Sequence, residues 1–222
     1  MTSPVTGYNF TKVFGVSVFV QSSLPASKFQ HVASVMAEWM DNDENGCVDT
    51  PAILKHLVPT KTGVNPPAMV VYKKGNSNWD SGFGSFAIRA PQEGWETRPN
   101  CSGTTGTDRC NDATLEEVFH VVSAQGYAEA FKKQFWIGTP FMAASEPNKI
   151  NSTLATLLDA ARGGIKRSPV VPSAGYPKKA WYTYSDTTCD FGCQAMEYFW
   201  MGVAAKTGAI KNRGTSITRE FK

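Results

Sequence analysis

The feature that most constrains this chain is the acidic run Met40-Asp-Asn-Asp-Glu-Asn-Gly-Cys-Val-Asp49, which comes directly after a helical pattern. Apolar residues before the run recur at helical spacing and predict a helix over residues 27–40 with one buried face. After the run, Thr50-Pro51 is a typical helix start, and Pro59 ends the second helical pattern. The acidic run is therefore predicted to be a short loop that joins two helices.

The spacing of oxygen-bearing side chains in this loop is typical of a calcium site. Ca²⁺ prefers oxygen ligands at alternate positions of a loop that bends at a glycine, and Gly46 stands at the bend. The run resembles an EF-hand loop, except that Ala52 replaces the bidentate glutamate at its end. The resemblance implies a structural calcium ion rather than a sensor, with an empty polar turn as the alternative. The implied ligands are Asp41, Asp43, Asn45 and Asp49.

Strands are predicted mainly in the first half of the chain. Residues 12–21 and 68–72 are rich in β-branched and aromatic side chains, as buried strands are. Residues 75–91 have the glycine and aromatic content of a hairpin or meander, and the polar residues 92–111 predict a surface loop.

Helices are predicted mainly in the second half. Asp112 or Thr114 is placed to cap the first of them, Gly126 to end it, and Gly208 to end the last. The predicted helices cover residues 112–125, 151–162 and 191–206.

Early strands and late helices together predict an α+β fold. The 222 residues, 41% of them hydrophobic, are enough for one sizeable core, so a single globular domain over 1–222 is expected. A subdivision into a strand-rich part, 1–111, and a helical part, 112–222, is compatible with this pattern.

A candidate metal site begins in the segment Thr114-Leu-Glu-Glu-Val-Phe-His-Val-Val122. Residues four apart lie on one face of a helix, so Glu116 and His120 could hold one metal ion, with Glu117 beside them. This layout is H-E-x-x-H with glutamate in place of the first histidine, and it resembles the zincin metallopeptidases. The resemblance implies that Glu116 and His120 are metal ligands and that Glu117 is the general base.

The third ligand in the glutamate-ligand branch of that superfamily, the gluzincins, comes from a downstream helix. Glu197 stands in the otherwise apolar segment Cys193-Gln-Ala-Met-Glu-Tyr-Phe-Trp200, which resembles the Glu-aromatic-aromatic segment of some of those families. A carboxylate among apolar residues must reach solvent or find a partner, and a metal ion would be such a partner. The resemblance implies a zincin-like arrangement, in which an N-terminal strand and helix layer precedes a C-terminal helical part that carries the site.

Two carboxylates and one imidazole form a harder ligand set than most zinc peptidases use, so iron or manganese is an alternative to zinc. A tyrosine near the metal would stabilise the oxyanion, and Tyr184 is the candidate, with Tyr182 nearly as good. A ferritin-like di-iron site would need a second Glu-x-x-His pair, and neither His31 nor His56 has a glutamate three residues before it.

The same residues also have an interpretation that needs no metal ion. Two acids near a helix start also follow from capping and dipole preferences. The favoured function is a metal-dependent, peptidase-like hydrolase that acts on a peptide or protein substrate. The alternatives are a non-enzymatic secreted binding or structural module stabilised by calcium, and an iron or manganese enzyme at the same site. Two aromatic clusters, at 135–136 and 198–200, are predicted to be core rather than sugar-binding surfaces.

The charge and hydropathy of the chain limit the classes of partner that it is expected to bind. The net charge is only +3 and the basic residues are scattered, so the electrostatic footprint of a nucleic-acid binder is missing. No apolar run is long enough to cross a bilayer, and the first residues lack a signal-peptide pattern.

The cysteines and glycosylation sequons favour a secreted glycoprotein whose signal peptide has been removed. Of the five cysteines, Cys101 is expected to pair with Cys110. Cys189 and Cys193 are expected either to bond to each other or to use one of the two for Cys47. Five reduced thiols in a cytosolic protein are the alternative. The sequons begin at Asn9, Asn100 and Asn151.

Overall fold

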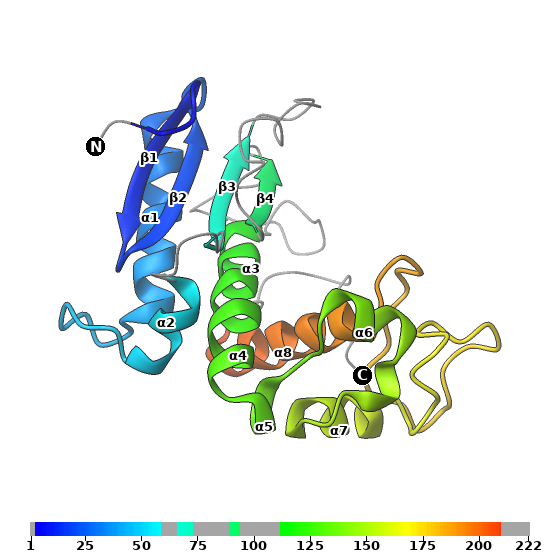
Figure 1. Ribbon diagram of the computed structural model, residues 1–222. Coiled ribbons are helices and arrows are strands. Elements are labelled where there is room, and N and C mark those ends of the chain that lie inside the picture. Colours follow the sequence, from blue (N-terminus) through cyan, green and yellow to red (C-terminus); the bar gives the residue numbers. More distant parts are fainter. Residues whose placement is uncertain (1–2, 59–65, 73–88, 94–111, 210–222) are drawn as a thin grey trace. The chain divides into compact units, whose positions relative to one another are not determined.

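The computed structural model describes residues 3–58, 66–72, 89–93 and 112–209 (Figure 1). The predicted pair Cys101–Cys110, and most of the predicted hairpin and surface loop between residues 75 and 111, lie outside these ranges. The chain forms two compact units, and the boundary between them on the described chain falls at Gly126. We call them the N-terminal unit, up to residue 126, and the C-terminal unit, from residue 127.

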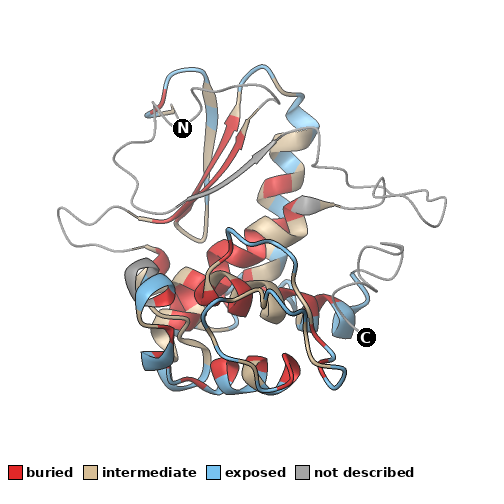
Figure 2. Ribbon diagram, turned by 90° about the vertical axis from the view of Figure 1, so that its right-hand side faces the viewer, coloured by how far each residue is buried: buried red, intermediate tan, exposed pale blue. Residues whose placement is uncertain are grey.

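A mixed four-stranded sheet forms the strand layer of the N-terminal unit, in the order β1-β2-β3-β4. β1 and β2 are antiparallel, whereas β2 pairs with β3, and β3 with β4, in parallel. Buried residues follow the two central strands, as their continuous apolar sequences require (Figure 2). The strands are β1 (Tyr8–Val13), β2 (Val16–Gln21), β3 (Ala68–Tyr72) and β4 (Arg89–Glu93).

The single strand predicted over residues 12–21 is wrong, because the chain reverses at Phe14-Gly15 and makes a hairpin. Val13 faces Val16 across a two-residue turn in which φ is 47° at Phe14 and 89° at Gly15. Positive φ at both central residues gives such a turn the twist of the flanking strands. Residues 89–93, divided between a predicted hairpin and a predicted loop, form the parallel strand β4 instead.

The predicted helix, loop and helix around the acidic run are confirmed. The first helix is α1 (Ala26–Met40), and the second begins as the 3₁₀ turn η1 (Pro51–Ile53) and continues as α2 (Leu54–Leu57). The buried face of α1 contains Val32, Val35, Met36 and Met40, at the spacing that the sequence predicts.

α3 (Ala113–His120) is fixed at its start by one aspartate. The Asp112 carboxylate accepts a hydrogen bond from the Thr114 backbone N–H at 3.1 Å, which makes Asp112 the N-cap. Its other oxygen lies 2.6 Å from Nε2 of His31 on α1. About two turns further on α1, the Trp39 indole donates to the Leu115 carbonyl at 3.0 Å. Two polar contacts therefore hold the first turn of α3 against α1.

The helix does not end at Gly126 as predicted. It continues from α3 into the π-helix η4 (Val121–Tyr127) and then into α4 (Ala128–Ala130). A β-carbon at position 126 would lie 3.1 Å from the Ile53 side chain and 3.2 Å from that of Leu57. The glycine therefore permits close packing of this helix on η1 and α2, rather than acting as a C-cap.

The C-terminal unit is helical, with a core around Leu158, Tyr182 and Phe191. Ser152 and Asp190 cap the two long helices, and Gly208 ends the second with φ of 79°. The predicted helices at 151–162 and 191–206 are thus confirmed to within two residues. The elements of the unit after α4 are α5 (Lys132–Phe135), α6 (Pro140–Ser145), η5 (Pro147–Lys149), α7 (Thr153–Ala161) and α8 (Phe191–Thr207).

Two arginines hold the connection between α7 and α8. Arg167 forms a bidentate ion pair with Asp159 and lies 4.4 Å over the ring of Phe191. Arg162 is fully buried and donates to the Val170 carbonyl, and burial lowers the pKa of its guanidinium. These contacts order a connection that has no helix of its own.

The combination of the mixed sheet with helices confirms the α+β class. None of the described helices has the length and apolar composition that a membrane span requires.

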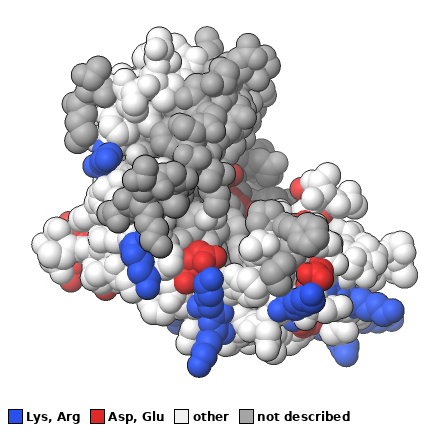
Figure 3. All heavy atoms as spheres, in the orientation of Figure 1, with Lys and Arg blue, Asp and Glu red and all other residues white. Residues whose placement is uncertain are grey.

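On the face shown in Figure 3, acidic side chains lie among the basic ones.

Replacement of Asp112 tests how α3 is held. We expect Asp112→Ala to lower the free energy of unfolding by about 1–3 kcal/mol, because it removes both the cap and the contact with His31. Asp112→Asn keeps a capping oxygen and should lose less. Urea denaturation followed by circular dichroism measures both. Equal losses for the two variants would contradict the capping role.

Candidate metal centres

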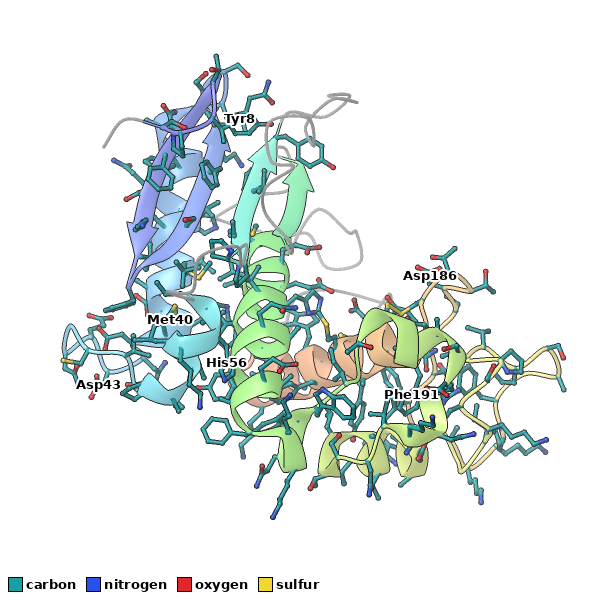
Figure 4. All side chains as sticks on the ribbon, in the orientation of Figure 1. Tyr8, Met40, Asp43, His56, Asp186 and Phe191 are labelled. Carbon is teal, nitrogen blue, oxygen red and sulfur yellow. A yellow bond between two sulfur atoms is a disulfide. The ribbon has the colours of Figure 1, made fainter. Side chains whose placement is uncertain are left out.

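Three carboxylates converge in the loop between α1 and η1. Asp41, Asp43 and Asp49 each offer an oxygen, and these oxygens lie within 4.8 Å of one another. Asp41 is buried and directly follows α1, whereas Asp43 and Asp49 are exposed. Figure 4 labels Asp43 in this loop. The cluster belongs wholly to the N-terminal unit.

The loop is wound around its own carboxylates. Asp41 accepts hydrogen bonds from the backbone N–H groups of Asn45 at 3.1 Å and Gly46 at 2.8 Å. Asp49 accepts one from the backbone N–H of Asn42 at 3.0 Å. The tight curve needs left-handed backbone at two positions, with φ of 56° at Glu44 and 84° at Gly46. Like charges this close repel one another, so a bound cation would relieve the strain of bringing them together.

Asn45, the fourth expected ligand, uses its amide within the loop. Its side-chain oxygen accepts from the Cys47 backbone N–H at 2.9 Å, and its amide nitrogen donates to Asp43 at 2.9 Å. Ala52 lies in η1 and offers no side-chain ligand at the place of the EF-hand glutamate. The side chains of this loop that could hold a cation are therefore those of the three aspartates.

The second candidate ligand pair lies on α3, also in the N-terminal unit. A carboxylate oxygen of Glu116 and a ring nitrogen of His120 lie within 4.8 Å of one another, as their spacing of one helical turn predicts. His120 is only 9% exposed, and Glu116 and Glu117 are half-buried. A buried imidazole beside a carboxylate is a suitable pair of ligands for a transition metal.

Glu197 and Tyr184 belong to the C-terminal unit. Glu197 is half-buried on α8, one turn after Cys193, and its neighbours Trp200 and Met201 are buried. Tyr184 precedes α8, and its backbone carbonyl accepts a hydrogen bond from the Tyr176 hydroxyl at 3.0 Å.

The start of α8 is braced by a disulfide. Cys189 and Cys193 are bonded to each other, which decides between the two pairings expected for them, and Cys47 is free and exposed. Asp190, between the two cysteines, caps the helix by accepting from the Cys193 backbone N–H at 2.9 Å. The turn that precedes Glu197 is therefore fixed both covalently and by a cap.

A hollow in the C-terminal unit was not predicted. Phe135, Tyr198 and Phe199, expected to be core, are half-buried and line this hollow, whereas Trp200 is core as expected. The sequence does not distinguish the aromatic residues that line the hollow from the one in the core. Whether an aromatic side chain is buried depends on which distant helices cover it.

Comparison with known proteins finds no family model, no curated protein and no solved structure that matches this chain.

Calcium titration tests the aspartate cluster. We expect calorimetry on protein freed of metal by chelation to show one Ca²⁺ bound with a Kd of roughly 10⁻⁴–10⁻³ M, since the loop lacks the terminal glutamate. Asp43→Asn should weaken binding about tenfold or more, because it removes one of the three convergent carboxylates.

Glu44→Gln is the matched control, because it removes one negative charge from the same loop but not from the cluster. Its Kd should stay within about threefold of the wild-type value, as expected for an exposed, screened charge. Absence of calcium binding to the wild type, or equal weakening in both variants, would show that the loop is a polar turn.

Proposed function

We propose that this chain is a metal-dependent hydrolase of the peptidase kind, in which Glu116, His120 and Glu197 hold one metal ion. The observation that carries the proposal is the approach of a Glu116 oxygen and a His120 ring nitrogen to within 4.8 Å on one face of α3. Their order around Glu117 resembles H-E-x-x-H. Glu197 would supply the third ligand from α8, in the zincin-like arrangement that the sequence implies.

The donor set decides which metals fit. Each of the three residues offers one ligand atom, an imidazole nitrogen or a carboxylate oxygen. Imidazole suits zinc and iron, and carboxylates suit manganese and iron as well as zinc. Three protein ligands leave a coordination position open, as catalytic rather than structural sites do. We therefore propose zinc, with iron or manganese as alternatives.

The remaining residues have roles that follow from their chemistry. A metal ion at the site would lower the pKa of water and polarise the substrate carbonyl. Glu117, next to the ligand Glu116, would take the proton from the attacking water as general base. The Tyr184 hydroxyl would donate a hydrogen bond to the oxygen on which negative charge develops. The substrate would be a peptide or protein.

A second function is favoured by a separate observation, the three convergent aspartates at 41, 43 and 49. A secreted binding or structural module stabilised by calcium needs such a loop and no catalytic metal. The disulfide Cys189–Cys193 and the exposed sequon residues Asn9 and Asn151 support secretion for either function. Elemental analysis separates the two functions.

Elemental analysis by plasma mass spectrometry should find about one equivalent of a transition metal in protein purified without chelator. His120→Gln, Glu116→Gln and Glu197→Gln should each lose most of it, because each removes one of three ligands. Glu129→Gln is the control, since Glu129 is an acid paired with Lys132 on the surface. Calcium alone in the wild type would favour the binding module.

Activity should separate the general base from the ligands. We expect Glu117→Gln to lower kcat on peptide substrates by about 10²–10⁴-fold while the metal content stays at the wild-type level. Tyr184→Phe should lower kcat by about 10²–10³-fold with little change in KM, as the loss of one oxyanion donor does. A fully loaded wild type that cleaves no peptide in a diverse library would contradict the peptidase function. Iron or manganese in that inactive protein would favour the remaining alternative, an iron or manganese enzyme at the same site.

A further inference from the structure

The C-terminal unit contains a hollow of about 510 Å³ between α5, α7 and α8, which we call the aromatic pocket. Its volume is within the range of small-molecule sites in proteins. Every residue that lines it belongs to the C-terminal unit, and none is acidic. Its lining includes Phe135, Leu157, Trp181, Tyr198, Gly202 and Lys206.

Two large apolar side chains are exposed in the part of the chain that the structure describes, and both line this pocket. Leu157 is 51% exposed and Trp181 is 41% exposed. Exposed apolar side chains that gather at one concave place indicate a binding site, whereas scattered ones do not. The pocket is therefore a site where apolar surface remains to be covered.

The aromatic walls are held by ring contacts, so the pocket is already formed. Phe135 stacks on Phe199 with ring centroids 5.0 Å apart. Trp181 contacts Tyr198 with ring centroids 5.7 Å apart. Pre-formed walls reduce the entropy that a ligand must overcome on binding.

Gly202 leaves space in the pocket at the expense of helix stability. It lies inside α8, where glycine is about 1 kcal/mol less favourable than alanine. A β-carbon at this position would meet no atom within 4 Å, so packing within the protein does not require a glycine here. The open volume above Gly202 is available to a ligand.

One positive charge stands at the rim of this apolar pocket. Lys206 follows Gly202 by one turn of α8, is exposed, and makes no ion pair with any residue in the described ranges. The hydroxyls of Thr153 and Thr207 are already bonded to backbone carbonyls of Lys133 and Val203. The full charge of Lys206 exceeds the roughly half negative charge at the end of α8. The rim therefore favours an anionic group.

We propose that the aromatic pocket binds an apolar monocarboxylate of the fatty-acid class. The carboxylate pairs with the Lys206 ammonium, and the hydrocarbon chain lies over Gly202 against Trp181 and Leu157. A sugar fits less well, because sugar hydroxyls need several free hydrogen-bonding side chains and two of the hydroxyls here are engaged. The proposal does not depend on the metal site.

Titration of the full chain with dodecanoate, below its micelle concentration, tests the proposal by calorimetry and by tryptophan fluorescence. We expect saturable binding of one molecule per chain and a change in the emission of Trp181. Gly202→Trp should raise Kd by about tenfold or more, because the new ring fills the volume above the helix. Gly202→Ala is the matched control and should change Kd by less than about threefold, since one methyl group leaves most of the volume open.

The head group is tested with dodecanol and dodecyltrimethylammonium. Dodecanoate should bind about tenfold more tightly than either, and Lys206→Gln should remove that preference. Thermal melting confirms that each variant is folded. The assignment is overturned if dodecanoate does not bind, if Gly202→Trp leaves its Kd unchanged, or if all three amphiphiles bind equally.

Discussion

The packing of α3 on α1 in the N-terminal unit depends on the two contacts of the Asp112 carboxylate. One oxygen caps α3, and the other reaches His31 on α1, so a single side chain both starts the helix and ties it to its neighbour. A cap contributes about 1 kcal/mol, and a partly buried hydrogen bond to a carboxylate adds a similar amount. Because Glu116 and His120 follow within two turns, the direction in which they project is set by this cap and by the bond from Trp39 to Leu115.

The acidic loop fixes the other end of the group formed by α1, α2 and the helix that begins as α3. It joins α1 to η1 and α2, and the side chains of Ile53 and Leu57 close around Gly126 of η4. The helix that carries Glu116 and His120 is thus held at its start by α1 and further along by α2, and the loop sets the geometry between these two supports. A calcium ion in the loop would therefore stabilise α3 without touching it. The calcium and transition-metal hypotheses therefore do not exclude each other.

Local patterns predicted the elements well, whereas contacts between distant residues could not be predicted. The helices follow from apolar spacing and from caps such as Asp112 and Gly208. The hairpin at Phe14-Gly15 was missed because phenylalanine is rare at positive φ. Gly126 was misinterpreted because a glycine that permits close packing and a glycine that ends a helix are identical in sequence. The Glu116–His120 pair was predictable from helical period alone, but the aromatic pocket was not, since it needs α5, α7 and α8 to meet around Trp181.

Helical geometry also separates the two proposed sites on α8. Tyr198, Gly202 and Lys206 are spaced by four residues and form one stripe, which faces the aromatic pocket. Glu197 lies one residue before this stripe, so it projects about 100° away around the helix axis. It instead shares a stripe with Cys193, which the disulfide holds in the first turn, and with the buried Met201. A ligand in the pocket and a metal at Glu197 would therefore occupy different faces of one helix, so binding at one proposed site would not sterically exclude binding at the other.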